Sequence, residues 1–331
     1  MQVLVTGGGG FLGRAIIMRL VERGDAVCSL ARNYYPQLEK IGVSQLQGDI
    51  SSREVADRAC RQKELVFHTA AKPPPWGRYT DYHKTNVTGT QNIIAACTRH
   101  QVARLVYTST PSVVFNGEDL EGVDESFPYP DKYKAPYPRT KALAEQEVVK
   151  AAAGGMKAVI LRPHEIWGPG DPHFVPRIIA RAAKLKQIGN GRNLVDTTYI
   201  DNAADAHILA ADKLAENPGL SGKIYFISQG EPIPAWDMIN AILKSAGLEP
   251  VRGSIPYPIA WIIGALLEVA YKTLRLPGEP QMTRFLAEAV SKAHWFDLGA
   301  ARRDLGYRPG ISTAEGLQRL EDWLKHSRLK E

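Results

Sequence analysis

A tyrosine and a lysine four residues apart, Tyr137 and Lys141, have the clearest chemical use in this chain. Side chains at this spacing lie on neighbouring turns of one helix face. A phenol with its ordinary pKa of about 10 is a poor acid or base at neutral pH, but a nearby cation favours the phenolate and lowers that pKa. We therefore expect Lys141 to lower the pKa of Tyr137, so that the phenol exchanges a proton with a carbonyl or alcohol oxygen.

Two hydroxyls, those of Ser109 and Thr110, follow the apolar run 104–108, which is predicted to be a strand. Either hydroxyl could hydrogen-bond the same substrate oxygen, and we favour Thr110. The alternative role is to cap the turn before Pro111, which suits Ser112 and stays open for Ser109. The expected catalytic residues are therefore Thr110, Tyr137 and Lys141, together with Ser109.

A glycine-rich turn at the start of the chain could bring a cofactor to these groups. Gly7, Gly10 and Gly13 recur every three residues between an apolar run at 3–5 and a predicted helix at 15–21. Backbone N–H groups can approach a diphosphate there without a Cβ in the way, and the helix adds the positive end of its dipole. This order predicts a dinucleotide site, the alternative being an ordinary turn. A nicotinamide ring would then exchange hydride while Tyr137 exchanges the proton.

The next predicted strand, residues 26–31, indicates which nicotinamide cofactor is bound. An acidic residue at its end would mark NAD(H), but the chain reads Ala31-Arg32-Asn33 there. A guanidinium suits a 2′-phosphate, so we expect NADP(H), with NAD(H) as the alternative if Arg32 is only a solvated loop residue. Asp49 and Ile50, which end the third strand, are expected to flank the adenine ring.

The elements that must position these groups alternate between strand and helix. Helices are expected at 52–63, 82–100 and 140–153, and strands at 65–68, 104–108 and 157–162. This alternation predicts an α/β fold with a doubly wound parallel sheet, the Rossmann arrangement, whose ligands bind at the carboxyl ends of the strands. Small residues after the fourth strand would let the chain pass close to the cofactor, and Asn86 could brace that loop. Lys141 is also expected to hold the ribose hydroxyls of the cofactor. The cofactor residues expected besides the glycines, Arg32, Asp49 and Ile50 are Phe11, Leu12, Ala70, Ala71, Lys72, Asn86, Thr108, Tyr137, Lys141, Pro163 and Ile166.

Beyond residue 163 the pattern becomes rich in turns and then mostly helical. Helices are expected at 174–188 and 202–214, and strands at 197–200 and 223–228. We expect residues 1–163 to form the NADP-binding domain, with 196–215 and 223–228 returning to it. The ranges 164–195 and 229–331 are expected to form a smaller, mostly helical substrate-binding lobe.

Composition excludes several other functions. The formal net charge of +6 is scattered, without the basic runs and interleaved aromatic residues typical of nucleic-acid binding. Three cysteines, Cys28, Cys60 and Cys97, lack metal-ligand spacing and are expected to be buried free thiols in a reducing compartment. We expect a cytoplasmic enzyme without a metal or a signal peptide, which binds no nucleic acid and forms a homodimer.

Together these motifs resemble the extended short-chain dehydrogenase/reductase superfamily, which shares the glycine start, the Ser/Thr pair and the Tyr-x-x-x-Lys pair. The segments 197–209 and 225–228 resemble the 3β-hydroxysteroid dehydrogenase branch and the sterol-4α-carboxylate 3-dehydrogenases. The segments 107–113, 166–171, 195–202 and 283–288 resemble the bacterial 2-alkyl-3-oxoalkanoate reductases of long-chain olefin biosynthesis. In one respect the chain departs from the superfamily, because Thr110 stands where a serine is usual.

The resemblance implies an NADP-dependent oxidoreductase that reduces the 3-oxo group of a long-chain 2-alkyl-3-oxo acid, or runs the reverse oxidation. The alternative is a 3β-hydroxysteroid or sterol-4-carboxylate 3-dehydrogenase, whose substrate also carries a carboxylate one carbon from the reacting carbon. A nucleotide-sugar epimerase or dehydratase would use the same Tyr137 and Lys141, and a noncatalytic nucleotide sensor would need neither. An NADPH site favours the direction of reduction.

A hydrophobic substrate requires apolar walls, and residues 255–276 are the most apolar stretch of the chain. Three charged residues toward its end make a membrane-spanning helix a poor interpretation. A pocket wall, a helix lying on a membrane or on a partner enzyme, and a plain core helix all stay open. We expect Trp76, His164 and Arg284 to touch the substrate, although His164 could equally be a packing residue.

Overall fold

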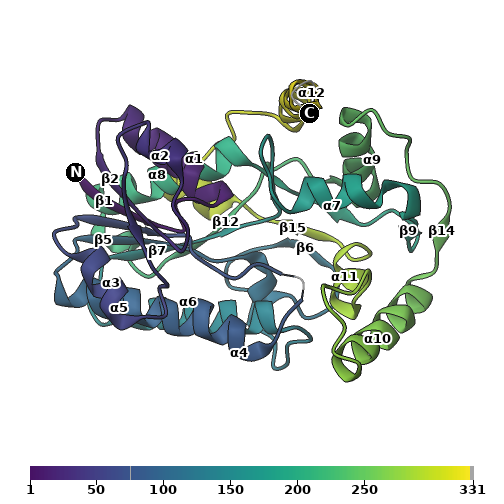
Figure 1. Ribbon diagram of the computed structural model, residues 1–331, viewed down its shortest axis with the longest axis horizontal. Helices are drawn as coiled ribbons and strands as arrows, with labels where there is room; N and C mark the ends of the chain where they lie inside the picture. The colour runs from purple at the N-terminus through teal and green to yellow at the C-terminus, as the bar shows by residue number, and fades with distance from the viewer. Residues whose placement is uncertain (75, 329–331) are drawn as a thin grey trace.

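The structure, a computed structural model, describes residues 1–74 and 76–328, and its centre is a parallel sheet of seven strands (Figure 1). All seven coincide with runs that the sequence predicts to be strands. Their order is β3-β2-β1-β4-β5-β7-β12, so the chain moves outward in opposite directions from the centre, which is the doubly wound arrangement. The strands are β1 (Gln2–Thr6), β2 (Ala26–Ala31), β3 (Ser44–Gln47), β4 (Leu65–His68), β5 (Arg104–Thr108), β7 (Ala158–Pro163) and β12 (Ile224–Ile227).

Helices cover both faces of this sheet because its strands are apolar on both sides. On one face α1 packs on α8, and on the other α5 packs between α3 and α6 (Figure 1). The residues of β4 and β7 are buried throughout, as expected for central strands of a parallel sheet. The helices are α1 (Phe11–Glu22), α2 (Pro36–Glu39), α3 (Arg53–Cys60), α5 (Gly89–Arg99), α6 (Pro136–Ala153) and α8 (Ile200–Glu216).

The prediction of a single helix at 82–100 is wrong in detail. The chain forms α4 (Tyr79–Tyr82), then a π-helical turn at His83–Thr88, and only then α5. At the junction Gly89 lies against Ile50, whose Cδ1 would be 2.5 Å from any Cβ added to the glycine. The wider π turn brings Asn86 inward, and such turns are frequent at functional sites.

Two other helices differ from their expected bounds. The helix expected at 140–153 begins already at Pro136, where proline suits the first turn because it lacks an N–H to satisfy. The helix expected at 174–188 is shorter in the structure, where α7 spans Phe174–Arg181 and a 3₁₀ turn follows at Ala182–Lys184. The chain then turns into the short strand β9 (Gln187–Ile188), which pairs with β14 (Ser254–Ile255).

The smaller lobe lies beyond the carboxyl ends of β5, β7 and β12 and combines helices with short strands (Figure 1). Its helices enclose a separate apolar cluster that includes Trp236, Ile242 and Ala260. A four-stranded sheet in the order β13-β10-β15-β6 connects the lobe to the main sheet. The division of the chain into two domains stays a prediction, and residues 329–331 lie outside the described range. The remaining elements are β6 (Leu120–Val123), β8 (Ile166–Trp167), β10 (Leu194–Val195), β11 (Thr198–Tyr199), β13 (Ile233–Pro234), β15 (His294–Phe296), α9 (Ala235–Ser245), α10 (Tyr257–Thr273), α11 (Arg284–Ala289), a π turn at Ala301–Leu305 and α12 (Thr313–Arg328).

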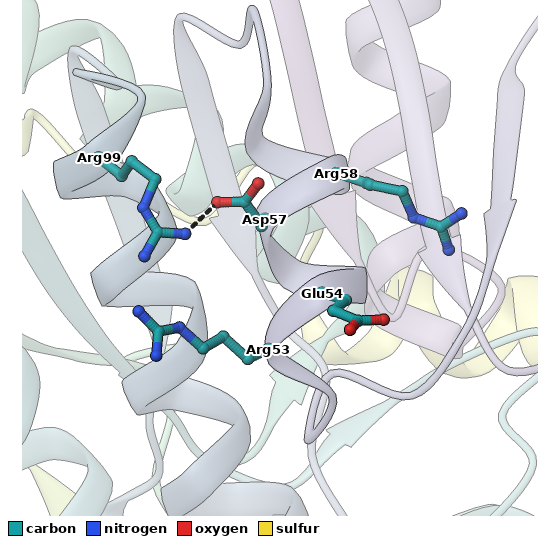
Figure 2. Close-up of a pocket in the computed structure, with 5 residues that line it drawn as sticks. All are labelled: Arg53, Glu54, Asp57, Arg58 and Arg99. Atoms are coloured by element: carbon teal, nitrogen blue, oxygen red, sulfur yellow. Dashed lines mark hydrogen bonds and ion pairs between the residues drawn. The ribbon is translucent and has the colours of Figure 1, made fainter.

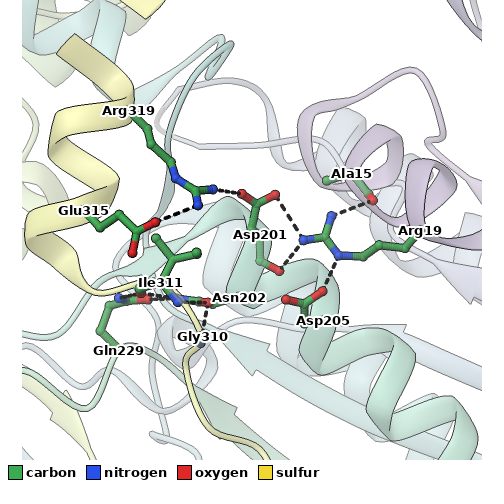
Figure 3. A network of polar contacts seen from close by, with 10 residues as sticks. All are labelled: Ala15, Arg19, Asp201, Asn202, Asp205, Gln229, Gly310, Ile311, Glu315 and Arg319. Atoms are coloured by element: carbon green, nitrogen blue, oxygen red, sulfur yellow. Dashed lines mark hydrogen bonds and ion pairs between the residues drawn. The ribbon is translucent and has the colours of Figure 1, made fainter. Parts of the chain in front are cut away.

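A polar network holds α1, and with it the glycine turn, in place (Figure 3). Arg19 of α1 bonds Asp201 and Asp205 at the start of α8, and Asp201 also pairs with Arg319 of α12. The buried Asn202 accepts hydrogen bonds from the backbone N–H groups of Gly310 and Ile311 at 2.9 and 3.0 Å. The motif at 197–209 therefore joins three helices around the dinucleotide half of the fold.

Candidate active site

The glycine turn fits the diphosphate of a dinucleotide. Gly7 has a φ of +71°, and a Cβ there would lie 2.9 Å from the Cα of Ala70. A Cβ on Gly13 would lie 2.3 Å from the carbonyl oxygen of Gly7, so only glycine lets α1 approach the turn this closely. Gly10 precedes α1, and no side chain of the described residues caps that helix. The N–H groups of its first turn, those of Phe11 and Leu12 included, therefore remain available to an anion.

At the end of β2, Arg32 is exposed and lies near Asp49 at the end of β3. Partial burial raises the pKa of Asp49, but hydrogen bonds with Ser51 and the charges of Lys84 and Arg32 outweigh it and leave that pKa below its ordinary value. The buried Ile50 follows Asp49 directly. The structure thus brings Arg32, Asp49 and Ile50 together beyond the glycine turn, where the sequence places the adenosine of the cofactor.

Tyr137 lies in the first turn of α6 and is hydrogen-bonded to Thr110, which follows β5. The ring of Tyr82 meets that of Tyr137 edge-on, with centroids 6.3 Å apart. Thr110 Oγ1 also accepts a hydrogen bond from the backbone N–H of Ser112 at 3.2 Å, so it caps the turn that Ser112 was expected to cap. Ser109 Oγ is buried and has no hydrogen-bond partner among the described residues. The geometry therefore associates Thr110, rather than Ser109, with the phenol.

Lys141 lies one turn further along α6, and its ammonium binds the sheet. Its Nζ donates to the hydroxyl of Tyr107 at 2.8 Å and to the carbonyl oxygen of Thr108 at 2.6 Å. Burial lowers the pKa of Lys141 to about 7, although the charge of Glu145 acts in the opposite direction. The ammonium is thus held from β5, with its charge directed at Tyr107 and Thr108.

The expectation that Lys141 lowers the pKa of Tyr137 is wrong for this structure. Burial raises the pKa of Tyr137 well above its ordinary value, and the negative charge of Glu165 raises it further. The hydrogen bond with Thr110 offsets only part of this increase. Removing the phenol from water disfavours its anion, and this effect decides the direction.

Behind the site, a buried chain of hydrogen bonds connects β1 to the π turn. The hydroxyl of Thr6 lies 2.6 Å from His68 Nδ1, and His68 Nε2 lies 3.0 Å from the hydroxyl of Thr90. Since Thr90 donates its own proton to the carbonyl oxygen of Asn86, His68 must carry its proton on Nε2. Burial lowers the pKa of His68 to about 3, which keeps the ring neutral. Only the position of His68 at a strand end could have indicated this role.

The prediction that Asn86 braces the loop after β4 is confirmed. Its side-chain oxygen accepts the backbone N–H of Lys72 at 2.8 Å, and its amide donates to Thr140 Oγ1 at 3.1 Å. Thr140 lies between Tyr137 and Lys141 on α6. Asn86 therefore fixes the loop that contains Ala70 and Ala71 relative to α6.

A buried ion pair that the sequence analysis missed sets the rotation of α6. Glu145 follows Lys141 by one turn, and its carboxylate accepts hydrogen bonds from Arg162 Nε at 3.1 Å and Nη2 at 2.6 Å. The hydroxyl of Tyr129 donates to the same carboxylate at 2.6 Å. Both charges are almost completely buried. Two features of the sequence could have predicted this pair. They are an arginine within a buried strand and an acid on the Tyr137 face of the helix, because buried charges must be paired.

The three residues expected to touch substrate have other contacts in this structure. Trp76 meets Tyr271 of α10 edge-on, with ring centroids 6.3 Å apart. His164 is buried, with Nδ1 2.8 Å from the carbonyl oxygen of Asp196 and its ring packed on His294 and Phe296. Arg284 donates to Glu268 of α10 at 2.7 and 3.0 Å. These contacts account for His164 and Arg284 structurally, and substrate contact by any of the three stays a prediction.

The remaining predicted cofactor residues lie at or shortly after the carboxyl ends of β5 and β7. Thr108 ends β5, and its hydroxyl oxygen is hydrogen-bonded to His207 Nε2 at 2.9 Å. Pro163 ends β7, and Ile166 begins the short strand β8. Between them Glu165 is exposed and has a φ of +37°, a strained backbone of the kind found at functional sites. Glu165, whose charge raises the pKa of Tyr137, was not among the residues predicted from the sequence.

A hollow of about 570 Å³ lies elsewhere, between α3 and α5 (Figure 2). Its lining is charged, and Asp57 is already paired with Arg99 across it. It is lined by helix residues on the outside of the sheet rather than by strand ends, so it is separate from the site of Tyr137. The lining residues are Arg53, Glu54, Asp57, Arg58 and Arg99.

Residues 4–257 match the family described as the 3-beta hydroxysteroid dehydrogenase/isomerase family. The 2-alkyl-3-oxoalkanoate reductase of Stenotrophomonas maltophilia (strain K279a) is 48% identical over 325 residues, which cover 97% of this chain and 98% of that protein. The decarboxylating sterol-4-alpha-carboxylate 3-dehydrogenase of Mus musculus is 33% identical over 331 residues, which cover 98% of this chain and 91% of that protein.

Among solved structures, UDP-glucose 4-epimerase of Thermus thermophilus in complex with NAD has the same fold. It superimposes with a TM-score of 0.75 at 25% identity, covering 98% of this chain and 99% of that one. The expected Rossmann fold of the extended short-chain dehydrogenase/reductases is thus confirmed.

Proposed function

Because the chain belongs to the 3-beta hydroxysteroid dehydrogenase/isomerase family, we propose that it is a nicotinamide-dependent oxidoreductase that reduces the 3-oxo group of a long-chain 2-alkyl-3-oxo acid. The relative that shares 48% identity along nearly its whole length supports this substrate class. The sterol-4-carboxylate dehydrogenases are more distant. A sterol substrate is therefore the alternative outcome of the test.

Tyr137 is the proton donor of the proposed reaction. The glycine turn would hold a nicotinamide cofactor, which would supply hydride to the carbonyl carbon of the substrate. The phenol of Tyr137 gives its proton to the carbonyl oxygen, which becomes the hydroxyl of a 3-hydroxy acid. Thr110, hydrogen-bonded to the phenol, orients it and offers a second hydroxyl to the same oxygen. Lys141, fixed by Tyr107 and Thr108, places a cation one helix turn away.

The observation that carries this proposal is the 48% identity to a reductase along nearly the whole chain, and the raised pKa of Tyr137 agrees with the direction of reduction. A raised pKa keeps the phenol protonated near neutral pH, and a protonated phenol is the form that can donate to a developing alkoxide. Oxidation would instead require a phenolate to accept the proton of the alcohol. A neutral phenol beside Thr110 therefore supports the role of Tyr137 as proton donor in reduction.

We infer further that the cofactor is NADP(H). The end of β2 offers the exposed Arg32 and no acid, which suits a 2′-phosphate better than a free ribose hydroxyl. Lys84, whose Nζ lies 3.8 Å from the carboxylate of Asp49, adds a second cation near the same position. These charges support NADP(H), whereas the epimerase structure of the same fold contains NAD.

The test is NADPH oxidation by the purified protein with a 2-alkyl-3-oxo fatty acid, beside a 3-oxo-4-carboxysterol and a UDP-sugar. Consumption of NADPH with the acyclic acid, absent in Tyr137→Phe, is the expected result. Consumption with the sterol alone would assign the chain to the sterol branch. Conversion of the UDP-sugar without net change in nicotinamide absorbance would replace the proposal by an epimerase.

A further inference from the structure

Helix α10 lies at the outer edge of the smaller lobe (Figure 1), and one of its faces is apolar and exposed. Seven of the eleven large apolar side chains that are exposed among the described residues fall within 259–276. Leu266 and Val269 are 66% and 60% exposed, and Leu274 just beyond the helix is 68% exposed. Along the helix these side chains recur three and four residues apart, which places them on one stripe. They are Ile259, Ile262, Ile263, Leu266, Val269, Leu274 and Leu276.

The opposite side of α10 already has its partner. Ala260, Gly264 and Glu268 are buried against the start of α11, where a Cβ on Gly264 would lie 2.6 Å from the backbone of Thr283. The helix therefore packs on α11 through these residues, while the apolar residues of the stripe face outward. This arrangement is the reverse of that in a core helix, and it corrects the interpretation of 255–276 as a plain core helix.

The charges around this face are cationic. Lys272 and Arg275 are both exposed at its end. The only acid within 255–276, Glu268, is buried and paired with Arg284, and the next acid, Glu279, is paired with Arg177 and Arg181. Among the described residues these two cations have no acidic partner. An apolar stripe bordered by such cations complements a surface that is apolar below and anionic above, as a bilayer with acidic headgroups is. No helix of the described residues is long and apolar enough to cross a membrane.

The same face lies next to the segment that leads to the catalytic tyrosine. Tyr271 packs edge-on against Trp76, and Lys272 Nζ lies 5.7 Å from the centroid of the Trp76 ring system. A few residues later Tyr82 contacts Tyr137. A lipid leaving a bilayer at α10 would therefore meet the loop at Trp76 before it meets Tyr137.

From these observations we propose that the exposed face of α10 docks on an anionic lipid bilayer, and that docking delivers long-chain substrate to Tyr137. The stripe inserts at the level of the headgroups and upper acyl chains, and Lys272 and Arg275 bind lipid phosphates. Docking itself is independent of the reaction, whereas delivery rests on the proposed function.

Docking is tested by sedimentation of the full chain with vesicles of phosphatidylcholine, with and without phosphatidylglycerol, in the absence of substrate. The wild-type protein should bind the phosphatidylglycerol vesicles, and Leu266→Asp/Val269→Asp should lose about tenfold or more of that binding. Lys272→Gln/Arg275→Gln should lose about fivefold for each cation, on anionic vesicles only. The matched control Met18→Asp/Trp323→Asp changes two exposed apolar residues of α1 and α12 and should bind as the wild type does.

Docking would be overturned if the wild-type protein bound neither vesicle type. It would also be overturned if Leu266→Asp/Val269→Asp bound the phosphatidylglycerol vesicles as well as the wild type does. A wild-type dimer that this variant converts to monomers, without vesicle binding, would assign the face to a second copy instead. Delivery has a separate readout, since the variant should slow turnover of a vesicle-borne long-chain substrate but not of a short water-soluble 3-oxo acid. Equal slowing of both substrates would overturn delivery, and absence of turnover by the wild type would refute the proposed function without affecting the docking result.

Discussion

The ammonium nitrogen of Lys141 lies 2.8 Å from the hydroxyl oxygen of Tyr107, with its charge 4.4 Å from the centroid of the Tyr107 ring. This buried tyrosine of β5 therefore fixes the cation of α6 from within the sheet. Tyr107 itself lies behind the site, where it positions Lys141. A phenylalanine would fill the same space in the core, so only the hydroxyl of Tyr107 gives this position its contact with Lys141.

Tyr107→Phe should lower kcat/KM about tenfold, because Lys141 loses a hydrogen bond from its charged group. The loss should appear mainly in kcat, and the midpoint of the pH–rate profile should move. Steady-state kinetics across pH measures both. Tyr225→Phe, which removes the hydroxyl of another buried tyrosine, is the matched control. Equal effects of the two changes would mean that Tyr107 is only structural.

Thr110→Val should lower kcat about a hundredfold, whereas Ser109→Ala should leave it within a factor of about two. Thr110 is hydrogen-bonded to Tyr137, while Ser109 Oγ is buried without a partner among the described residues. Thr110→Ser restores the hydroxyl and should recover most of the rate. A larger loss in Ser109→Ala than in Thr110→Val would reverse this assignment.

Stability should rise with pH between about 7 and 10 because of Lys141. Burial lowers its pKa to about 7 in the folded protein, while the unfolded chain keeps the ordinary value of 10.5. In this window the unfolded state binds more protons, so the free energy of unfolding increases with pH, by on the order of 4 kcal/mol in all. Urea unfolding at a series of pH values measures the slope. Lys141→Met should flatten it, and an unchanged slope in that variant would contradict the prediction.

Arg162→Met should destabilise the protein by about 3 to 5 kcal/mol, because Glu145 would keep a buried charge without its partner. The double change Glu145→Leu/Arg162→Met removes both charges and should recover much of that loss. Chemical denaturation of the three proteins gives the coupling energy. Additive losses would show that Glu145 and Arg162 do not act as a pair.

Arg32→Ala should weaken NADPH binding about ten- to a hundredfold and NADH binding hardly at all, since only the 2′-phosphate needs the guanidinium. Fluorescence titration with each cofactor measures the two constants without requiring a substrate. Arg61→Ala, another exposed arginine beyond α3, controls for general charge. Equal weakening of both cofactors by Arg32→Ala would leave NAD(H) as the better assignment.

The sequence alone determined the local features of this protein. The seven strands, the glycine turn and the spacing of Tyr137 and Lys141 depend on apolar runs, on backbone freedom and on the helix repeat, all of which are properties of neighbouring residues. The motifs of the sequence also indicated, without the structure, a resemblance to a known branch of reductases.

Only the tertiary structure decided how those residues behave. Tyr107 binding Lys141, Glu145 pairing with Arg162 and the phenol of Tyr137 buried beside Thr110 each join residues that are distant in sequence. Burial then overruled the local expectation, because desolvation acts on Tyr137 more strongly than a cation whose hydrogen bonds go to Tyr107 and Thr108. The sequence also could not predict which face of α10 is exposed, because an apolar segment does not specify which of its faces the rest of the chain covers.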